Sequence, residues 1–338
     1  MSKRCLKAIF IVGNSRSGTS MIARILNNHP DIYTFIHELH FFEELTDSNE
    51  LFQEISFKKA KKIYANLLSI IYKGYLSKRE PQLYFSEAEK CLKQLDQLTP
   101  ANIYRHFLFY ITQKNGKQIP CEQTPRNLFY LKEIFKIFPQ AKIINMMRDP
   151  RDVLLSQKNK WRLRFIGYKN HPLSESVRAF INYNPFIISK LWNSAIKEYE
   201  QFKNDSRVIN IKFEDLVLRP EKTLKEVCKF LDINMEKSMF DIPVIGSSFQ
   251  SSVNKRGIIK NTVTRWKKGG LTPSEIYICQ KINADLMKKY GYEIVETSQA
   301  PLGLLFTIFS LLLRTPFIVL LNLRRYKNFK EAVLRRFK

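Results

Sequence analysis

The stretch AIFIVGNSRSGTSMIARILNN, residues 8–28, determines the fold that we expect for this chain. It opens with a short apolar run, Ala8–Val12, of the kind that forms a buried strand in a parallel sheet. A loop of glycine, serine and asparagine begins at Gly13, and from Thr19 onward the apolar residues recur at the spacing of a helix. A strand, a glycine-bounded loop and a helix in this order are typical of the first unit of an α/β protein.

Further along the chain, strand and helix patterns alternate. This alternation predicts a doubly wound parallel sheet flanked by helices. The simplest division is one domain over residues 5–298 and an apolar and basic C-terminal helical tail over residues 299–338. Within the domain we expect strands at 32–36, 143–147 and 208–211, and helices within 51–112, at 126–138, from about 151, at 174–203 and at 221–231.

The loop Gly13–Ser20 lies where an α/β protein binds phosphate, because its free amides and the helix dipole both face an anion. Its spacing matches the phosphate-binding pattern G-x-x-x-x-G-K-[ST], except that Thr19 takes the place of the lysine. Without that lysine an ATPase or kinase loses its main contact to the β- and γ-phosphates. Arg16 supplies a positive charge at a different point, inside the loop.

A second anion motif follows the strand predicted at 143–147. Arg148 leaves the end of this strand, and Ser156 comes eight residues later, about two turns into a helix that Pro150 can start. A guanidinium and a hydroxyl placed in this way can converge on one phosphate. The neighbouring Arg151 and Asp152 are expected to cap the helix. Two anion sites at two strand ends suit a nucleotide with phosphates at two separate positions.

In combination, these motifs resemble the 3′-phosphoadenosine 5′-phosphosulfate (PAPS)-dependent sulfotransferases, most closely the bacterial branch that also resembles protein-tyrosine sulfotransferases. The likeness extends in order over nearly all of residues 8–295. The segments that carry it beyond the two motifs are 120–126, 213–216 with Pro220 and 230–231, 265–267, 271–272 and 291–292. One departure is Gln123, which replaces the family's lysine.

The resemblance implies a P-loop-like fold and an enzyme that moves the sulfuryl group from PAPS to an acceptor hydroxyl and releases PAP, with no metal. It implies that Arg16 contacts the 5′-phosphate and the bridging oxygen, and that Arg148 and Ser156 bind the 3′-phosphate. Further donors at the 5′ end are Ser17, Gly18, Thr19 and Ser20, and the late basic loop contributes Lys255 and Arg256 to the 3′ site.

Glu38 is the candidate general base, since it aligns with the family's acidic residue after the H-P-D segment. A general base must reach the acceptor proton through about one hydrogen bond. His40 or His37 is an alternative candidate for the general base. The two histidines lie three residues apart, but no third ligand accompanies them, so we expect no metal site.

The charge and the cysteine content indicate which partners the protein binds and in which compartment it lies. There are 56 Lys and Arg against 31 Asp and Glu, a formal net charge of +25, which favours anionic partners. The five cysteines are scattered, and the N-terminal apolar stretch is too short for a signal peptide, so we expect a cytoplasmic protein. We expect no nucleic-acid partner.

The tail combines an apolar segment, residues 302–323, with basic residues. Arg314 and Pro316 interrupt the segment, and eight Lys or Arg occur from Arg314 to Lys338 against one acid. We therefore expect residues 302–338 to lie on an anionic membrane surface rather than to span a bilayer. The alternative is a helix that packs on the domain or on an oligomer partner.

Two other functions compete with sulfuryl transfer. A nucleotide kinase would share the fold but needs the missing lysine and a magnesium-binding acid. A non-enzymatic basic protein that binds membrane or nucleic acid would explain the charge but not two phosphate motifs at strand ends. The acceptor stays open among carbohydrate, glycolipid, lipid hydroxyl and protein tyrosine.

Overall fold

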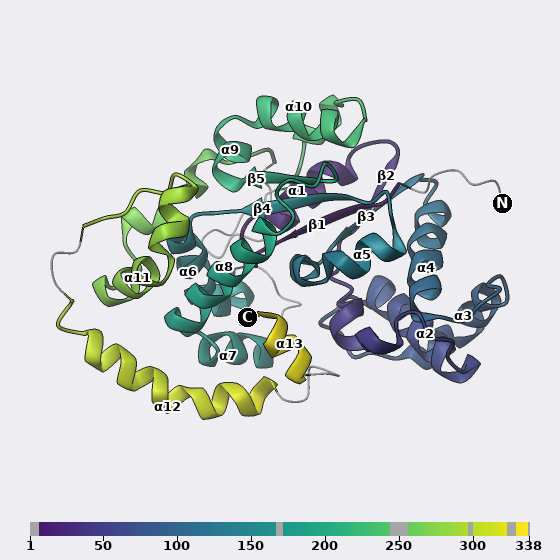
Figure 1. The fold of residues 1–338 in the computed structure, drawn as a ribbon, viewed down its shortest axis with the longest axis horizontal. Coiled ribbons are helices and arrows are strands. Elements are labelled where there is room, and N and C mark those ends of the chain that lie inside the picture. The colour runs from purple at the N-terminus through teal and green to yellow at the C-terminus, as the bar shows by residue number, and fades with distance from the viewer. Residues whose placement is uncertain (1–6, 167–171, 244–255, 297–299, 323–328, 337–338) are drawn as a thin grey trace.

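The computed structural model describes residues 7–166, 172–243, 256–296, 300–322 and 329–336. Within these residues, five parallel strands form one sheet in the order β2-β3-β1-β4-β5 (Figure 1). The first strand of the sequence therefore lies at its centre, with crossovers to either side, as a doubly wound sheet requires. The strands are β1 (Ile9–Gly13), β2 (Ile32–Phe35), β3 (Ile119–Gln123), β4 (Lys142–Met147) and β5 (Val208–Lys212).

Both faces of the sheet are covered by helices. Alternate side chains of each strand point to opposite faces and are buried on both. From β1, Ile9 and Ile11 join an apolar cluster with one group of helices, whereas Phe10 and Val12 join a larger cluster with another group. Figure 1 shows these groups on opposite sides of the sheet. The first group is α1 (Thr19–Asn27), α9 (Phe213–Leu218) and α10 (Pro220–Leu231). The second includes α2 (Phe57–Lys73), α3 (Phe85–Leu92), α4 (Pro100–Lys114), α5 (Leu131–Ile137) and α8 (Pro185–Glu200).

The predicted doubly wound architecture is confirmed, but three segments differ from expectation. The segment 126–138, expected as one helix, is a 3₁₀ segment over Pro125–Tyr130 followed by α5. Strand β3 was not predicted, because Pro120 and Glu122 break the apolar pattern of a buried strand. The segment 174–203 forms two helices, α7 (Leu173–Ile181) and α8, because Asn184 caps a new helix that begins at Pro185. The remaining α-helices described within residues 7–296 are α6 (Pro150–Lys158) and α11 (Pro273–Lys289), and short 3₁₀ and π segments lie between the elements.

The tail forms two helices, α12 (Leu304–Asn322) and α13 (Phe329–Arg336). Helix α12 packs against α7 and α11, and α13 packs against α8 (Figure 1). Among the described helices, none combines the length and the apolarity that crossing a bilayer requires.

Candidate active site

The loop between β1 and α1 is pressed so closely against its neighbours that two glycines have no room for a side chain. A Cβ on Gly13 would lie 2.3 Å from the Met146 carbonyl oxygen, and one on Gly18 would lie 2.4 Å from the ring of Phe213. Gly18 also has a φ of +97°, and no side chain caps the helix that follows it. The first amides of α1 are therefore available to an anion.

Two side chains of this loop have properties expected of a binding site. Arg16 has a left-handed backbone with a φ of +72°, a conformation that costs a non-glycine residue about 1–3 kcal/mol and tends to occur at functional sites. The hydroxyl of Ser17 is fully buried and finds no hydrogen-bond partner among the described residues. Nearby, Thr19 is buried and Ser20 is exposed.

The structure brings the two predicted anion motifs into direct contact. Arg16 Nε donates a hydrogen bond of 2.9 Å to Ser156 Oγ on α6. Arg148 Nη1 donates to the Arg16 carbonyl oxygen at 3.2 Å. Arg16, Arg148 and Ser156 thus form one cluster at the ends of β1 and β4.

The guanidinium of Arg148 is held in a fixed orientation. It lies 4.2 Å above the ring of Phe213, donates to the Thr262 carbonyl oxygen at 2.8 Å and approaches Asp152 to 3.6 Å. The backbone of Arg148 is held as well, because Trp192 Nε1 donates to the Arg148 carbonyl oxygen at 2.9 Å. The Nε of Arg148 is buried and has no partner among the described residues, so a donor is left over for an anion.

Arg151, by contrast, stabilises the helix start, as predicted. Asp149 accepts the Arg151 backbone amide at 2.9 Å and pairs with its guanidinium at 2.7 Å. The same guanidinium lies 3.8 Å above the ring of Trp266, whose amide donates to Asp152 at 3.0 Å. These bonds fix α6 and therefore fix Ser156.

The candidate base lies in the segment that follows β2. Glu38 has a side chain that is 37% exposed, and its carboxylate lies 2.9 Å from Nε2 of the buried His40. The other ring nitrogen, Nδ1, lies 3.3 Å from the Glu43 carboxylate, which is itself buried. His40 is therefore held between two carboxylates and has a left-handed backbone with a φ of +47°.

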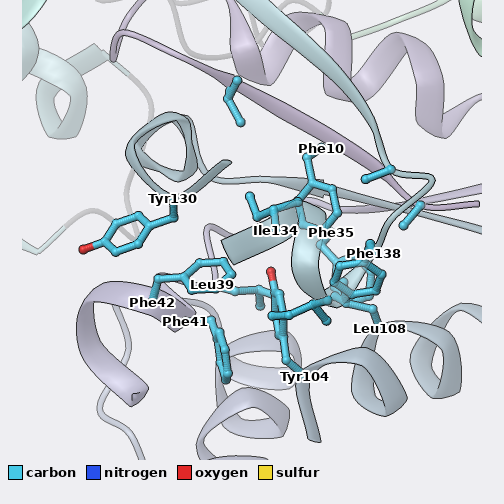
Figure 2. Close-up of a cluster of buried hydrophobic side chains, with 14 of the residues drawn as sticks. Phe10, Phe35, Leu39, Phe41, Phe42, Tyr104, Leu108, Tyr130, Ile134 and Phe138 are labelled. Carbon is cyan, nitrogen blue, oxygen red and sulfur yellow. The ribbon is translucent and has the colours of Figure 1, made fainter. Parts of the chain in front are cut away.

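Apolar neighbours fix this segment. Leu39, Phe41 and Phe42 point into the buried cluster shown in Figure 2. Phe41 stacks on Tyr104 with ring centroids 4.1 Å apart, and Phe42 stacks on Tyr130 at 5.2 Å. Glu38 and His40 thus stand on either side of a residue anchored in the core.

The charges of this site depend on one another. Burial on its own lowers the pKa of His40, but the hydrogen bonds to both carboxylates outweigh it and raise the pKa to about 9. Burial pushes the pKa of Glu38 upward, yet the bond from His40 and the charges of His40 and Arg126 leave it below its ordinary value. At neutral pH the pair is therefore an imidazolium beside a carboxylate. A carboxylate can accept a proton there, whereas the imidazolium cannot.

Lys160 is a cation that the sequence reasoning missed. Burial and the charge of Arg16 lower the pKa of Lys160 to about 8, while the charge of Glu38 opposes this shift. Its charge therefore acts on both the anion cluster and the candidate base. No sequence pattern pointed to it, because α6 ends at Lys158 and Lys160 opens a separate short 3₁₀ segment, Lys160–Ile166.

The remaining predicted site residues lie elsewhere or outside the described part of the chain. Arg256 is exposed and its Nη2 pairs with the Asp241 carboxylate at 2.8 Å, and Lys255 lies outside the described residues. His37 is exposed, and burial of part of its ring lowers its pKa. No group of three or more potential metal ligands occurs within the residues that the structure describes.

The chain is similar to known proteins of one family. Residues 8–237 match the model of the sulfotransferase family. The sulfotransferase 2A1 of Rattus norvegicus is 27% identical over 162 residues, which cover 48% of this chain and 55% of that protein. The protein-tyrosine sulfotransferase 1 of Danio rerio is 23% identical over 299 residues, covering 84% of this chain and 72% of the relative. The chain thus spans about half the length of the first of these relatives.

Solved structures show the same fold. The sulfotransferase domain of the Synechococcus PCC 7002 olefin synthase has a TM-score of 0.53 and 20% identity, covering 86% of this chain and 96% of that one. The sulfotransferase domain from the curacin biosynthetic pathway has a TM-score of 0.51 and 18% identity, covering 86% and 99%.

Proposed function

The chain belongs to the sulfotransferase family, and on this basis we propose that it transfers the sulfuryl group of PAPS to an acceptor hydroxyl and releases PAP. The observation that carries the proposal is the single cluster of Arg16, Ser156 and Arg148 where β1 and β4 end. Ligands of open α/β sheets bind at this carboxyl edge of the strands.

The donor nucleotide fits the polar atoms that the protein leaves over. The buried Ser17 hydroxyl and the uncapped amides of Gly18, Thr19 and Ser20 suit the 5′-phosphosulfate. Arg148, with its remaining Nε donor, and Ser156 suit the 3′-phosphate. Lys255 and Arg256 are proposed as further donors to that phosphate, Arg256 by exchanging its Asp241 partner for it.

The reaction then follows from the charges around the acceptor. The acceptor oxygen attacks the sulfur while the bond from sulfur to the PAP phosphate oxygen breaks, and Glu38 takes the hydroxyl proton. Arg16, at the 5′ end, offsets the charge that develops on the leaving phosphate, as positioned cations do in phosphoryl transfer. His40, protonated at neutral pH, holds the Glu38 carboxylate in place.

Nucleotide binding without metal is the first test. PAP should raise the melting temperature of the protein in the presence of a chelator, whereas ATP should have little effect. Arg16→Ala and Arg148→Ala should each weaken PAP binding, by about tenfold or more for the loss of a charge-assisted bond. A protein that responds to ATP with magnesium but not to PAP would refute the proposal and support a kinase.

The base is tested by Glu38→Gln. This variant should bind PAP as the wild type does but transfer radiolabelled sulfate from PAPS to acceptors in a cell extract at least about a hundredfold more slowly. Normal turnover would remove Glu38 from the mechanism. The labelled product in the wild-type reaction would also identify the acceptor class.

The proposal extends to the tail, which we place on an anionic membrane surface with a glycan or lipid-linked acceptor nearby. Helix α12 exposes apolar side chains along its length. Leu305 and Leu312 are 80% and 66% exposed, and its Phe306, Thr307, Ser310 and Arg314 line a cavity of about 370 Å³ against the domain. Outward apolar residues on a strongly basic protein suit a membrane of anionic lipid.

Vesicle sedimentation tests the tail. The wild type should pellet with vesicles of phosphatidylcholine and phosphatidylserine and much less with phosphatidylcholine alone. The double variant Leu305→Glu, Leu312→Glu should stay in the supernatant. The matched control is Leu83→Glu, at a leucine that is 61% exposed elsewhere on the surface, and it should pellet like the wild type. Equal sedimentation of the double variant and the control would contradict the membrane proposal.

A further inference from the structure

The C-terminal helix α13 is fastened to the domain by Arg335. The guanidinium of Arg335 donates to the Phe129 carbonyl oxygen at 2.9 Å, pairs with Glu133 at 2.6 Å and lies 4.5 Å from the centre of the Tyr130 ring. The same Tyr130 ring stacks on Phe42, at the edge of the cluster in Figure 2. The helix therefore sits directly over the core that supports the candidate base.

The next residue of α13, Arg336, is buried and reaches into that site. Its guanidinium pairs with Oε1 of Glu43, 293 residues earlier in the chain. The other oxygen of Glu43, Oε2, lies 3.3 Å from His40 Nδ1 and 3.2 Å from Arg126 Nη1. Burial raises the pKa of Glu43, but Arg126, His40 and Arg336 together hold it well below its usual range.

We propose that Arg336 is a positioning residue for sulfuryl transfer. From the C-terminal helix it fixes the Glu43 carboxylate, which orients His40, and His40 in turn holds Glu38 at 2.9 Å. This inference rests on the proposed function and adds to it that the tail forms part of the catalytic site. The contacts form an unbroken path from Arg336 to the residue assigned as the base.

The physical reason is that a buried carboxylate keeps one orientation only when both of its oxygens have partners. Without Arg336, Glu43 keeps its charge partners on Oε2 but loses the bond that fixes Oε1, so the carboxylate can rotate about its terminal torsion. His40 then loses a fixed partner at Nδ1, and Glu38 loses a fixed imidazolium. A displacement of about 1 Å at a reacting group can reduce the rate about a hundredfold.

The test compares Arg336→Gln, Arg336→Lys and the control Leu334→Gln in the full chain. Leu334 lies on the same helix with its side chain 53% exposed, away from the buried Glu43. Each variant is assayed for sulfate transfer from saturating radiolabelled PAPS to one cell-extract preparation, and for PAP binding by calorimetry. Arg336→Gln should transfer at least about tenfold more slowly with PAP affinity unchanged, while Arg336→Lys recovers part of the rate and Leu334→Gln stays within about twofold of wild type.

A double-mutant cycle separates positioning from general stability. In a Glu43→Gln background, Arg336→Gln should cause little further loss of rate, because the path is already broken. Independent, multiplicative losses, or a rate for Arg336→Gln equal to the wild type, would overturn the inference. A wild type that binds PAP but transfers no sulfate to any acceptor would instead refute the proposed function.

Discussion

Glu122 gives the sharpest prediction for stability. It lies on β3 with its side chain fully buried, where it accepts hydrogen bonds from Thr124 Oγ1 and from Asn127 Nδ2, the latter at 2.6 Å. Thr124 Oγ1 in turn accepts the Leu39 amide at 3.1 Å, directly beside Glu38. Burial raises the pKa of Glu122 from 4.5 to about 7.

The sign of the effect follows from the raised pKa. Between pH 4.5 and 7 the folded protein keeps the Glu122 proton, whereas the unfolded chain releases it, so the free energy of unfolding falls as pH rises through this range. With these two pKa values, Glu122 should lower the free energy of unfolding by about 2.5 kcal/mol between about pH 5 and pH 8. Glu122→Gln keeps the shape of the side chain and one accepting oxygen but does not titrate.

The assay is urea unfolding of wild type and Glu122→Gln at several pH values across that interval. The stability of the variant relative to the wild type should increase with pH by about 2.5 kcal/mol. The matched control is Glu293→Gln, at an exposed carboxylate that pairs with Lys267 at 2.6 Å, and it should show no such gain. Parallel curves for wild type and Glu122→Gln would show that Glu122 titrates normally and would refute the reasoning.

Three further predictions concern the loop, the helix start and the base. Gly18→Ala should abolish PAP binding and lower the melting temperature, because its Cβ would lie 2.4 Å from the Phe213 ring and its φ is +97°. Calorimetry measures the binding and thermal unfolding the melting temperature, and a normal PAP affinity would contradict the close packing. Arg151→Ala should lower the free energy of unfolding by about 3–5 kcal/mol, because it leaves the buried Asp149 carboxylate without its charged partner. A loss below about 1 kcal/mol in urea unfolding would argue against this ion pair. The pH profile of kcat should fall on the acid side only below the ordinary pKa of a glutamate, because His40 lowers the pKa of Glu38; an acid limb near neutral pH would exclude Glu38 as the titrating base.

The sequence predicts the parts of the fold that local patterns encode. Strands β1, β2, β4 and β5 are short apolar runs, so their positions were predicted within a residue or two. Strand β3 was missed because the side chain that it buries is the acid Glu122. Its hydrogen bonds come from Thr124 and Asn127, and only the folded chain shows that they satisfy it.

The candidate site, too, could be predicted only in part from the sequence. Arg16, Arg148 and Ser156 could be placed at one edge of the sheet from the sequence, because parallel strands bring their carboxyl ends together. The direct bond from Arg16 to Ser156 could not be predicted. Glu43 and Arg336 could not, because they are separated by 293 residues and their contact depends on where the tail packs. For α12 the composition predicted an apolar helix but not that Thr307, Ser310 and Arg314 line a cavity against the domain.

The hydrogen bond from Arg16 to Ser156 has a consequence for how the nucleotide enters. In the free protein this bond connects residues assigned to opposite ends of the donor. A phosphate at the 5′ end that binds the Arg16 guanidinium competes with the Ser156 hydroxyl for it. It therefore changes the hydrogen bonding of Ser156, which is assigned to the 3′-phosphate. Occupation of either end is therefore thermodynamically linked to occupation of the other, and the linkage is reciprocal. A thermodynamic cycle of adenosine, the two nucleotides with a phosphate at only one end and the bisphosphate would measure this linkage as the non-additivity of their binding free energies.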